Sequence, residues 1–437
     1  MKVLKFGGTS VGTPQRIKEV AGLITDEKGK TLTVLSAMSG TTNSLLEIDS
    51  ALQNVDKSKA SDLLCSLRKK YDDVIANLYS SDDYKAKAAS IVGDFFSRLE
   101  ALAAADYNDY TQREIVAHGE LISTNLMHQY MLQQGIKAVL LPALEYMKKD
   151  AAGEPDFNHI SKELNRLLTE HKDTDIFLTQ GYICRNHEGG VDNLDRGGSD
   201  YTASIIGGVL RAEEVQIWTD IDGMHNNDPR FVEETEAVHN LHFEEAAELA
   251  YFGAKILHPT CIQPAKVNNV PVRLLNTMEP TAEGTLIDNS LSRGTIKAVA
   301  AKDGITAIKI KSSRMLLAYG FLKRVFEIFE KYETPIDMIA TSEVGVSLTI
   351  DNDANLNAIL EDLKKLGTVS VDRDMVIICV VGDLSWQNRG FEAKALDALR
   401  NIPVRMISYG GSNYNVSFLI RSCDKVKALR LLSYHLF

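Results

Sequence analysis

The chain has 437 residues, of which 44% are hydrophobic and 24% charged, and its formal net charge is -11. This composition supports ordinary buried cores and excludes an intrinsically disordered chain. An acidic chain lacks the clustered Lys and Arg that bind nucleic-acid phosphates, so no nucleic-acid partner is expected, and an anionic substrate needs a local basic site. At roughly 150 residues per domain, the length suggests about three domains.

The cysteines and the apolar segments indicate a compartment. The five cysteines are scattered and form no C-x-x-C pair, which argues against a disulfide framework or a zinc site and fits a reducing environment. The apolar part of residues 1–7 is too short for a signal peptide, and no run of about 18 apolar residues predicts a membrane span. We therefore expect a cytoplasmic protein with no membrane partner.

The first part of the chain predicts a parallel α/β domain. Residues 2–6 read as a strand that runs into the glycine turn Gly7–Ser10, a helix is expected over 15–24, and residues 31–36 read as a second buried strand. This order is the usual opening of a parallel α/β domain. Residues 44–134 are mostly helical in pattern.

More strands continue this predicted sheet. They are expected over residues 138–141, 175–179, 214–219 and 270–275, with a helix over 201–211. The strand at 270–275 is expected to close the domain. The segment Thr277–Arg293 contains Pro, Gly, Ser, Thr and Asn, a composition that indicates a linker.

Beyond this linker the predicted element order is βαββαβ, which is that of a ferredoxin-like unit. Its elements are expected at 305–312, 315–332, 335–341, 344–350, 356–366 and 369–372. A second such unit follows, with elements at 375–381, 391–399, 404–408, 415–420 and 423–432. It lacks a sixth strand, and an unpaired sheet edge is unfavourable. We infer that residues 295–300 supply that strand, so that the first unit is inserted within the second.

A lysine and a glycine turn form the first candidate anion site. Lys5 stands at a strand end beside Gly7 and Gly8. Glycines let backbone N–H groups approach phosphate oxygens, and a helix N-terminus adds positive potential. The lysine would then span the terminal phosphates of a nucleotide. The alternative is an ordinary tight turn with a solvated lysine, and the pattern is not that of a P-loop.

A second glycine turn leads into the helix predicted at 201–211. Here Arg196 is able to bind a carboxylate through two parallel hydrogen bonds, and Asp200 is able to orient a lysine. The alternative is that Ser199 or Asp200 only caps the helix. Further along the chain, Lys255 is a better candidate for binding phosphate than His258, which we interpret as structural.

Two further positions combine charge with an unusual setting. The loop after the strand at 214–219 carries carboxylates and Arg230, suited to a ribose and phosphates, although a polar turn is the alternative. Glu120 follows Gly119 inside a helical pattern. Gly in a helix costs about 1 kcal/mol relative to Ala, so the close approach of another group is one explanation and a kink with a solvated glutamate is the other.

Together these segments resemble the aspartokinases, members of the amino acid kinase family. The matching segments stand in the family's order and spacing and are Lys5–Ser10, Ser36–Thr42, Arg196–Tyr201, Trp218–Asp220, Asp228–Arg230 and Phe252–Pro259. The resemblance covers essentially the whole chain, and the C-terminal pair of units resembles the ACT domains of these enzymes. It implies a catalytic domain at 1–285, a linker and completing strand at 286–304, and ACT units at 305–374 and 375–437.

The resemblance implies a reaction in which ATP and L-aspartate give ADP and 4-phospho-L-aspartate, with Mg²⁺ as cofactor. A side-chain carboxylate with a pKa of about 3.9 is already ionised at neutral pH, so this nucleophile needs no general base. The difficulty is to bring an anion to a polyanion. Catalysis is therefore expected to be positioning plus charge neutralisation.

The resemblance also implies roles for individual residues. Lys5 and Lys255 would contact the ATP phosphates, and Asp200 would organise the lysines. Arg196 would bind the α-carboxylate of aspartate and Glu120 its ammonium group. The other implied substrate residues are Ser39, Thr42 and Ser199, and the other implied nucleotide residues are Gly7, Gly8, Thr219, Asp220, His225, Asp228, Arg230 and Ile256. His225–Asn227 departs from the Tyr-Thr-Thr that is frequent in the family, which affects contacts to the nucleoside.

The first ACT unit resembles that of the lysine-inhibited branch. The implied effector residues are Met315, Phe321, Leu322, Asp337, Thr341, Ser342 and Glu343. Ala318 stands where that branch usually has serine. We expect L-lysine as the effector, a homodimer or dimer of dimers, and a monofunctional enzyme, because no homoserine dehydrogenase segment follows Phe437.

Two other functions remain open at this stage. One is a kinase for glutamate, N-acetylglutamate or carbamate, which the ACT pair and the combination of Arg196 with Glu120 disfavour. The other is a non-catalytic amino-acid sensor, which the intact Lys5, Asp200 and Lys255 disfavour. A substrate panel and an ADP-release assay distinguish the three.

Overall fold

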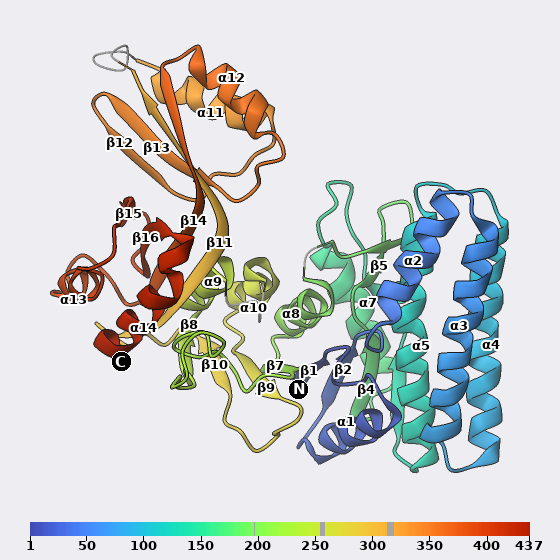
Figure 1. Ribbon diagram of the computed structural model, residues 1–437. Coiled ribbons are helices and arrows are strands. Elements are labelled where there is room, and N and C mark those ends of the chain that lie inside the picture. Colours follow the sequence, from blue (N-terminus) through green and yellow to red (C-terminus); the bar gives the residue numbers. More distant parts are fainter. Residues whose placement is uncertain (196, 254–257, 313–318) are drawn as a thin grey trace. The chain divides into compact units, whose positions relative to one another are not determined.

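The computed structural model describes residues 1–195, 197–253, 258–312 and 319–437 (Figure 1). The chain forms two compact units. The first comprises Met1–Met224 and Leu257–Asn289, and the second comprises His225–Ile256 and Ser290–Phe437. Residues 225–256, which the sequence analysis placed in the catalytic domain, thus group with the C-terminal part of the chain.

A mostly parallel sheet forms the centre of the first unit. Its strands in this unit run in the order β3-β4-β2-β1-β7-β9-β10. They are β1 (Lys2–Phe6), β2 (Thr31–Leu35), β3 (Ala138–Leu141), β4 (Ile176–Gln180), β7 (Val215–Thr219), β9 (Val272–Asn276) and β10 (Thr285–Asp288). The ladders from β3 through β9 are parallel, and β10 is antiparallel to β9. The carboxyl ends of the parallel strands therefore meet at one edge, where α/β proteins bind their ligands.

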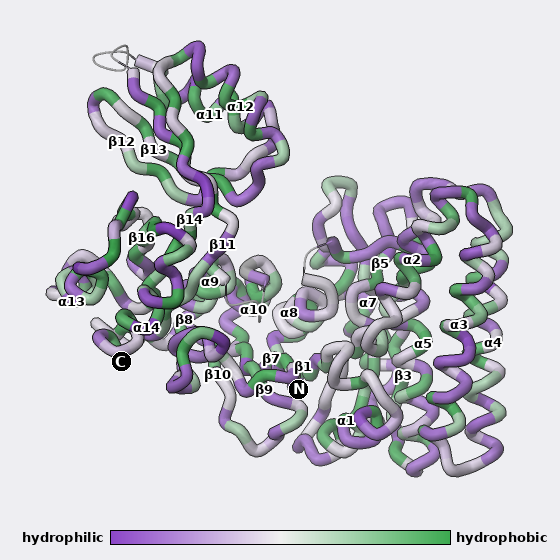
Figure 2. The backbone as a smooth tube through the Cα atoms, viewed as in Figure 1, coloured by the Kyte–Doolittle hydropathy of each residue, from purple (hydrophilic) through white to green (hydrophobic). Residues whose placement is uncertain are grey.

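Helices cover this sheet and extend it on one side. They are α1 (Pro14–Asp26), α2 (Thr41–Gln53), α3 (Lys57–Leu78), α4 (Asp82–Ala104), α5 (Thr111–Gln133), α6 (Ala143–Tyr146), α7 (Phe157–Glu170), α8 (Gly198–Leu210), η1 (Pro259–Ile262) and α10 (Gln263–Val267). The long helices α3, α4 and α5 lie side by side (Figure 1). Green apolar and purple polar segments alternate along α3 and α4 in Figure 2, as expected for helices with one buried face.

The predicted strands and helices of this unit are confirmed, but the predicted end of the sheet is wrong and some elements were missed. Strand β9 does not close the sheet, because β10 lies inside the predicted linker Thr277–Arg293 and pairs with it. The glycine and polar residues that indicated a linker form the turn between two antiparallel strands. The sequence analysis also missed helix α7 and the hairpin of β5 (Ile183–Arg185) and β6 (Val191–Asn193).

The second unit contains a six-stranded sheet in the order β12-β13-β11-β14-β16-β15. Its elements are β8 (Asn240–His242), α9 (Phe243–Tyr251), β11 (Ile296–Lys311), α11 (Phe321–Lys331), β12 (Ile339–Ser342), β13 (Gly345–Ile350), α12 (Leu356–Lys364), β14 (Thr368–Gly382), α13 (Phe391–Ala398), β15 (Met406–Ser408), β16 (Asn415–Arg421), η3 (Ser422–Asp424) and α14 (Lys425–Leu436). Helices α11 and α12 pack on one half of the sheet and α13 and α14 on the other, each with its own apolar core.

Two long strands join these halves. The predicted strands at 295–300 and 305–312 are one strand, β11, and those at 369–372 and 375–381 are one strand, β14. Ala298 pairs with Val381 and Ile308 with Val371, so residues 296–302 lie beside the strand assigned to the second ferredoxin-like unit. The predicted start of the next helix at Met315 lies outside the described residues, and α11 begins at Phe321.

None of the helices in the described part of the chain combines the length and the hydrophobicity that a bilayer crossing requires.

Gly119 allows α5 to approach the end of β2. A Cβ atom placed there would lie 2.8 Å from the Cβ atom of Ala37, closer than two carbons can pack. This explains the glycine inside the helix: a close approach required it. Ala37 is buried and lies two residues after the end of β2, so Gly119 lets Glu120 of α5 reach the loop after β2.

We therefore predict that Gly119→Ala lowers the free energy of unfolding by up to about 2 kcal/mol. The gain in helix propensity is about 1 kcal/mol, and crowding in a packed core typically costs 1–3 kcal/mol. Gly22→Ala in α1 is the matched control, because nothing lies within 4 Å of its added Cβ atom. It should stabilise by up to about 1 kcal/mol. Urea unfolding measures both, and equal effects would contradict the role of Gly119.

Candidate active site

Several predicted site residues of the first unit lie at the carboxyl edge of its sheet. Lys5 stands near the end of β1, Ser39 and Thr42 follow β2, and Thr219 ends β7. Ser199 and Asp200 belong to the first turn of α8. The parallel register of β2, β1 and β7 brings these segments together from distant parts of the sequence.

The centre of this edge is an ion pair between Lys5 and Asp200. The Nζ atom of Lys5 lies 2.6 Å from Oδ1 of Asp200, and both side chains are largely buried. The predicted interaction of Asp200 with a lysine is therefore present. The pair leaves an ammonium group fixed near the N-terminus of α8, where backbone N–H groups and the helix dipole also favour an anion.

The glycine turn packs closely against the loop after β2. A Cβ atom on Gly8 would lie 2.8 Å from the carbonyl oxygen of Ala37, and the N–H of Ser39 donates to the carbonyl of Gly8 at 3.0 Å. Gly7 donates its N–H to the carbonyl of Trp218 in β7. The turn is thus bound on both sides, and a side chain on Gly8 would push the loop with Ser39 away.

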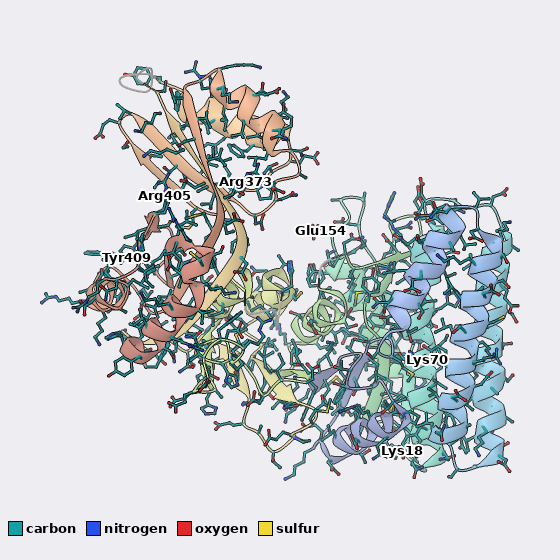
Figure 3. All side chains as sticks on the ribbon, viewed as in Figure 1. Lys18, Lys70, Glu154, Arg373, Arg405 and Tyr409 are labelled. Carbon is teal, nitrogen blue, oxygen red and sulfur yellow. The ribbon has the colours of Figure 1, made fainter. Side chains whose placement is uncertain are left out.

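The loop from Ser36 to Thr42 receives support from two other elements. The hydroxyl of Ser36 donates to that of Ser199 at 2.9 Å, which joins the loop to α8. From α3, the ammonium group of Lys70, labelled in Figure 3, donates to the carbonyl oxygen of Ser39 at 2.7 Å. Sequence reasoning missed Lys70, because a lysine on an amphipathic helix is ordinarily solvated and nothing in its spacing distinguishes it.

Glu120 is the most unusual carboxyl group at this edge. It is 4% exposed, and its Oε1 accepts a hydrogen bond from the backbone N–H of Ala37 at 3.2 Å. Within the described residues its Oε2 is buried and has no hydrogen-bond partner. Burial raises the pKa of this carboxyl group to about 8. A buried oxygen without a partner is a position that a cationic group such as an ammonium ion would satisfy.

The predicted nucleotide residues divide between the two units. Thr219 and Asp220 belong to the first, where the hydroxyl of Thr219 donates to Asp220 and accepts from the N–H of Ile221. His225, Asp228 and Arg230 belong to the second. There the guanidinium group of Arg230 binds both carboxylate oxygens of Asp228, at 2.9 and 2.6 Å. Their part in nucleotide binding stays a prediction.

Three other predicted residues, Arg196, Lys255 and Ile256, lie outside the described residues, as does Met315 among the effector residues. Of the remaining effector residues, Phe321 is buried in the core between α11 and the sheet. Leu322, Thr341, Ser342 and Glu343 are exposed. The side chain of Phe321 is therefore not available to a ligand, although its backbone is.

Asp337 is buried within the second unit, with a side chain that is 1% exposed. Its Oδ1 lies 2.6 Å from the ammonium group of Lys302 and accepts a hydrogen bond from the hydroxyl of Tyr251 at 2.8 Å. Lys302 also lies 2.9 Å from Asp351. Among the described residues the Oδ2 of Asp337 has no partner, so this carboxylate is only partly neutralised.

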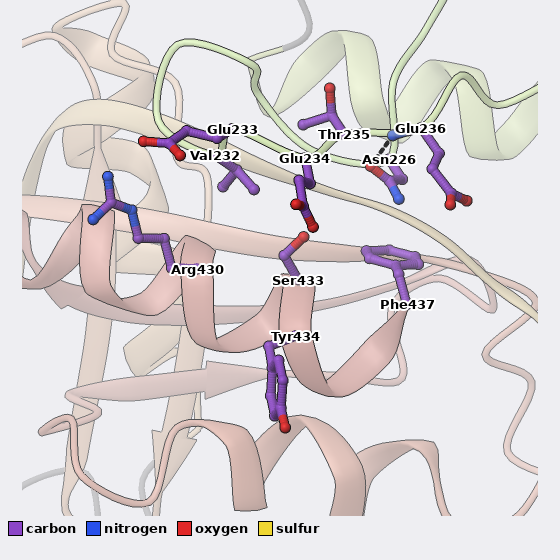
Figure 4. Close-up of a pocket in the computed structure, with 10 residues that line it drawn as sticks. All are labelled: Asn226, Val232, Glu233, Glu234, Thr235, Glu236, Arg430, Ser433, Tyr434 and Phe437. Carbon is purple, nitrogen blue, oxygen red and sulfur yellow. Dashed lines mark hydrogen bonds between the residues drawn. The ribbon is translucent and has the colours of Figure 1, made fainter.

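The second unit also contains a cavity of about 900 Å³ between the loop after His225 and helix α14 (Figure 4). It is lined by Asn226, Val232, Glu233, Glu234, Thr235, Glu236, Arg430, Ser433, Tyr434 and Phe437. No predicted site residue is among these described residues.

Comparison with known proteins identifies the family. The model of the amino acid kinase family matches residues 1–276, and an ACT domain model matches residues 378–436. The lysine-sensitive aspartokinase 3 of Escherichia coli K12 is 30% identical over 100% of this chain and 99% of its own length. The chloroplastic aspartokinase 3 of Arabidopsis thaliana is 34% identical over 98% of this chain and 80% of its own.

Comparison with solved structures leads to the same family. The E. coli aspartokinase III in complex with aspartate and ADP, in the R-state, superposes with a TM-score of 0.83 at 29% identity. The same enzyme with lysine and aspartate, in the T-state, gives 0.83 at 30% identity. Both comparisons cover 100% of each chain. The predicted fold class, an α/β amino acid kinase fold followed by ferredoxin-like ACT units, is confirmed.

We predict that Glu120→Gln makes the free energy of unfolding less sensitive to alkaline pH. The pKa of this carboxyl group is about 8 in the folded chain, against 4.5 for an ordinary glutamate, so the folded state holds the proton more tightly. The protonated carboxyl group of Glu120 therefore contributes stability in full below pH 4.5, and this contribution is lost as the pH rises through about 8. The neutral amide avoids this loss.

Urea unfolding between pH 5 and pH 9 measures the effect. The stability of Glu120→Gln relative to the parent chain should rise across this range by an amount on the order of a few kcal/mol. Glu100→Gln, at an exposed position of the neighbouring helix α4, controls for the loss of one glutamate. A difference that stays constant with pH would show that Glu120 is not the titrating group.

Proposed function

The chain belongs to the amino acid kinase family and, within it, to the aspartokinases, and we propose that Lys5, Asp200 and Glu120 form the core of its active site. The chain is an ATP-dependent kinase that phosphorylates the side-chain carboxylate of aspartate, and the alternative functions are not favoured. The observation that carries the assignment of residues is the buried pair of Lys5 and Asp200 at the carboxyl edge of the sheet, beside the glycine turn.

Lys5 would neutralise the transferring phosphoryl group. Its ammonium lies 3.5 Å from the position of a Cβ atom on Gly7, so it faces the backbone of the turn that would carry the phosphates. Asp200 fixes it there before the substrates arrive. Charge that is already held in place stabilises the transition state without reorganisation, which is where such a site gains most of its rate.

Aspartate would bind with its ammonium group at Glu120 and its α-carboxylate at Arg196. The unpartnered Oε2 of Glu120 supports this orientation, because an ammonium group would complete its hydrogen bonding. Ser39, Thr42 and Ser199 would surround the same substrate. Its side-chain carboxylate, ionised at neutral pH, then attacks the γ-phosphorus of ATP directly, and no residue has to remove a proton.

Mg²⁺ would accompany the nucleotide. In kinase sites it is usually held by the substrate phosphates and one or two carboxylates, and it neutralises charge that develops on the phosphate oxygens. Asp200 is a carboxylate suited to this role, because it stands in the first turn of α8 beside the lysine that would contact the phosphates.

L-lysine is the proposed inhibitor, with its binding site in the first ACT unit. The buried Oδ2 of Asp337 would accept an effector ammonium group, and the backbone N–H groups after Gly320, at the start of α11, would bind its carboxylate. A relative that is named lysine-sensitive and a solved structure of such an enzyme with lysine support this proposal. The oligomeric state and the cytoplasmic location stay predictions.

We predict that Lys5→Ala lowers kcat for ADP release with aspartate by about 100-fold or more, because the lost charge acts mainly in the transition state. Lys2→Ala is the matched control on the same strand, where the ammonium group pairs with Glu27 instead. It should leave kcat within about twofold. A folded Lys5→Ala enzyme with normal turnover would remove Lys5 from the reaction.

We predict that Asp337→Ala abolishes inhibition by L-lysine and leaves the uninhibited kcat nearly unchanged. Lys302 keeps Asp351 as a partner, so the fold should persist. Asp351→Ala is the control, since it removes the other carboxylate on Lys302 but not the proposed effector ligand. ADP release at rising lysine concentration measures both, and wild-type enzyme that ignores millimolar lysine would end the proposal.

A further inference from the structure

A buried lysine of the first unit contacts the segment that leads directly to Arg196. The side chain of Lys149 is 7% exposed, and its Nζ atom donates to the carbonyl oxygen of Asn193 at 3.1 Å and to Oδ2 of Asp195 at 2.9 Å. It also lies 3.2 Å from Oδ2 of Asp192. All three partners belong to the end of β6 and the two residues after it.

Other contacts hold both Lys149 and its partner Asp192 in place. The backbone N–H of Lys149 donates to the carbonyl of Arg185 in β5 at 2.8 Å, so its position follows that hairpin. Asp192 is also bound by Arg113 of helix α5, at 3.2 Å. Burial lowers the pKa of the Lys149 ammonium, but the hydrogen bonds to Asp195 and Asp192 outweigh this and raise it, so the charge is kept.

Close packing also restricts the glycines at 181 and 197, which lie on either side of this segment in the sequence. A Cβ atom on Gly197 would overlap Sγ of Cys261, and one on Gly181 would overlap Oγ of Ser199. Neither position therefore has room for a larger residue. Within the segment, Leu194 donates its N–H to the carbonyl of Tyr182 at 2.7 Å, and the described contacts of Asp195 are those with Lys149.

We propose that Lys149 is a positioning residue for aspartate: it holds the segment 193–195 so that Arg196 meets the α-carboxylate in the correct orientation. The inference rests on the proposed role of Arg196 and deepens it. Arg–carboxylate recognition depends on two parallel hydrogen bonds, so a small rotation of the backbone before Arg196 would weaken both.

A purely structural role explains these contacts less well. Removing two charges from water costs several kcal/mol, and replacing a buried ion pair by apolar groups is often neutral or stabilising. The buried pair of Lys149 with Asp192 carries this cost, whereas the further contacts of Lys149 with Asn193 and Asp195 specify a geometry. Lys149 makes its contacts to the backbone and the side chain on either side of Leu194, which fixes the path of the turn.

Steady-state kinetics of the full chain test the proposal with three variants. Lys149→Met keeps the length of the side chain and leaves Asp192 paired with Arg113. Asp195→Asn, at a side chain that is 70% exposed, weakens one contact without disturbing the core. Lys148→Met is the control, because in the described part of the chain its ammonium group makes no ion pair.

We expect Lys149→Met to raise KM for aspartate about tenfold, with KM for ATP changed less than twofold. A general loss of positive charge would raise KM for ATP at least as much, because ATP carries more negative charge. Asp195→Asn should raise KM for aspartate about two- to threefold. Loss of a negative charge would by itself lower this KM, so a rise indicates positioning. Lys148→Met should change neither constant.

Arg196→Ala separates this inference from the proposed function. If it raises KM for ATP and not for aspartate, the proposed role of Arg196 is wrong. If it raises KM for aspartate while folded Lys149→Met does not, or changes both constants equally, Lys149 is not a positioning residue. Should Lys149→Met fail to fold, Asp195→Asn decides alone, and an unchanged or lower KM for aspartate overturns the proposal.

Discussion

The ion pair between Lys5 and Asp200 is the contact on which the site of the first unit depends. Lys5 comes from β1, the strand between β2 and β7, and Asp200 comes from the first turn of α8. The pair therefore joins the middle of the sheet to the helix above its carboxyl edge. A reaction that brings an anion to a polyanion requires positive charge that is oriented before either arrives, and a largely buried pair provides it.

Both units contain an acidic side chain that is buried and incompletely paired. Glu120 in the first and Asp337 in the second each have one oxygen without a hydrogen-bond partner among the described residues. Such groups cost free energy in the absence of a ligand. An amino acid with a free ammonium group would remove that cost, so the same chemistry suits a substrate in one unit and an effector in the other. In the second unit, the hydroxyl of Tyr251 at the end of α9 also donates a hydrogen bond to Asp337.

The local patterns predicted most elements but not how far each continues. Residues 138–141 form a strand with the predicted bounds, since a short apolar run between polar residues has few alternatives. The strands predicted at 295–300 and 305–312 are one strand, because β14 pairs along the whole of β11 and a polar interruption near Asp303 does not end a strand whose partners continue. Strand β10 was missed for the same reason: its pairing with β9 is not encoded in its own four residues.

The sequence by itself determined the chemistry of the protein: the order of the glycine turns, Lys5, Arg196 and the carboxylates is specific, and residue identity decides charge. It also raised the correct question about Gly119, which only the contact with Ala37 answered. Tertiary structure alone decided which charges are paired or buried. Lys70 and Lys149 look like solvated lysines in the sequence, yet one binds the loop after β2 and the other the segment before Arg196. The reason is physical: pairing and burial depend on neighbours supplied by distant segments, and no local pattern records them.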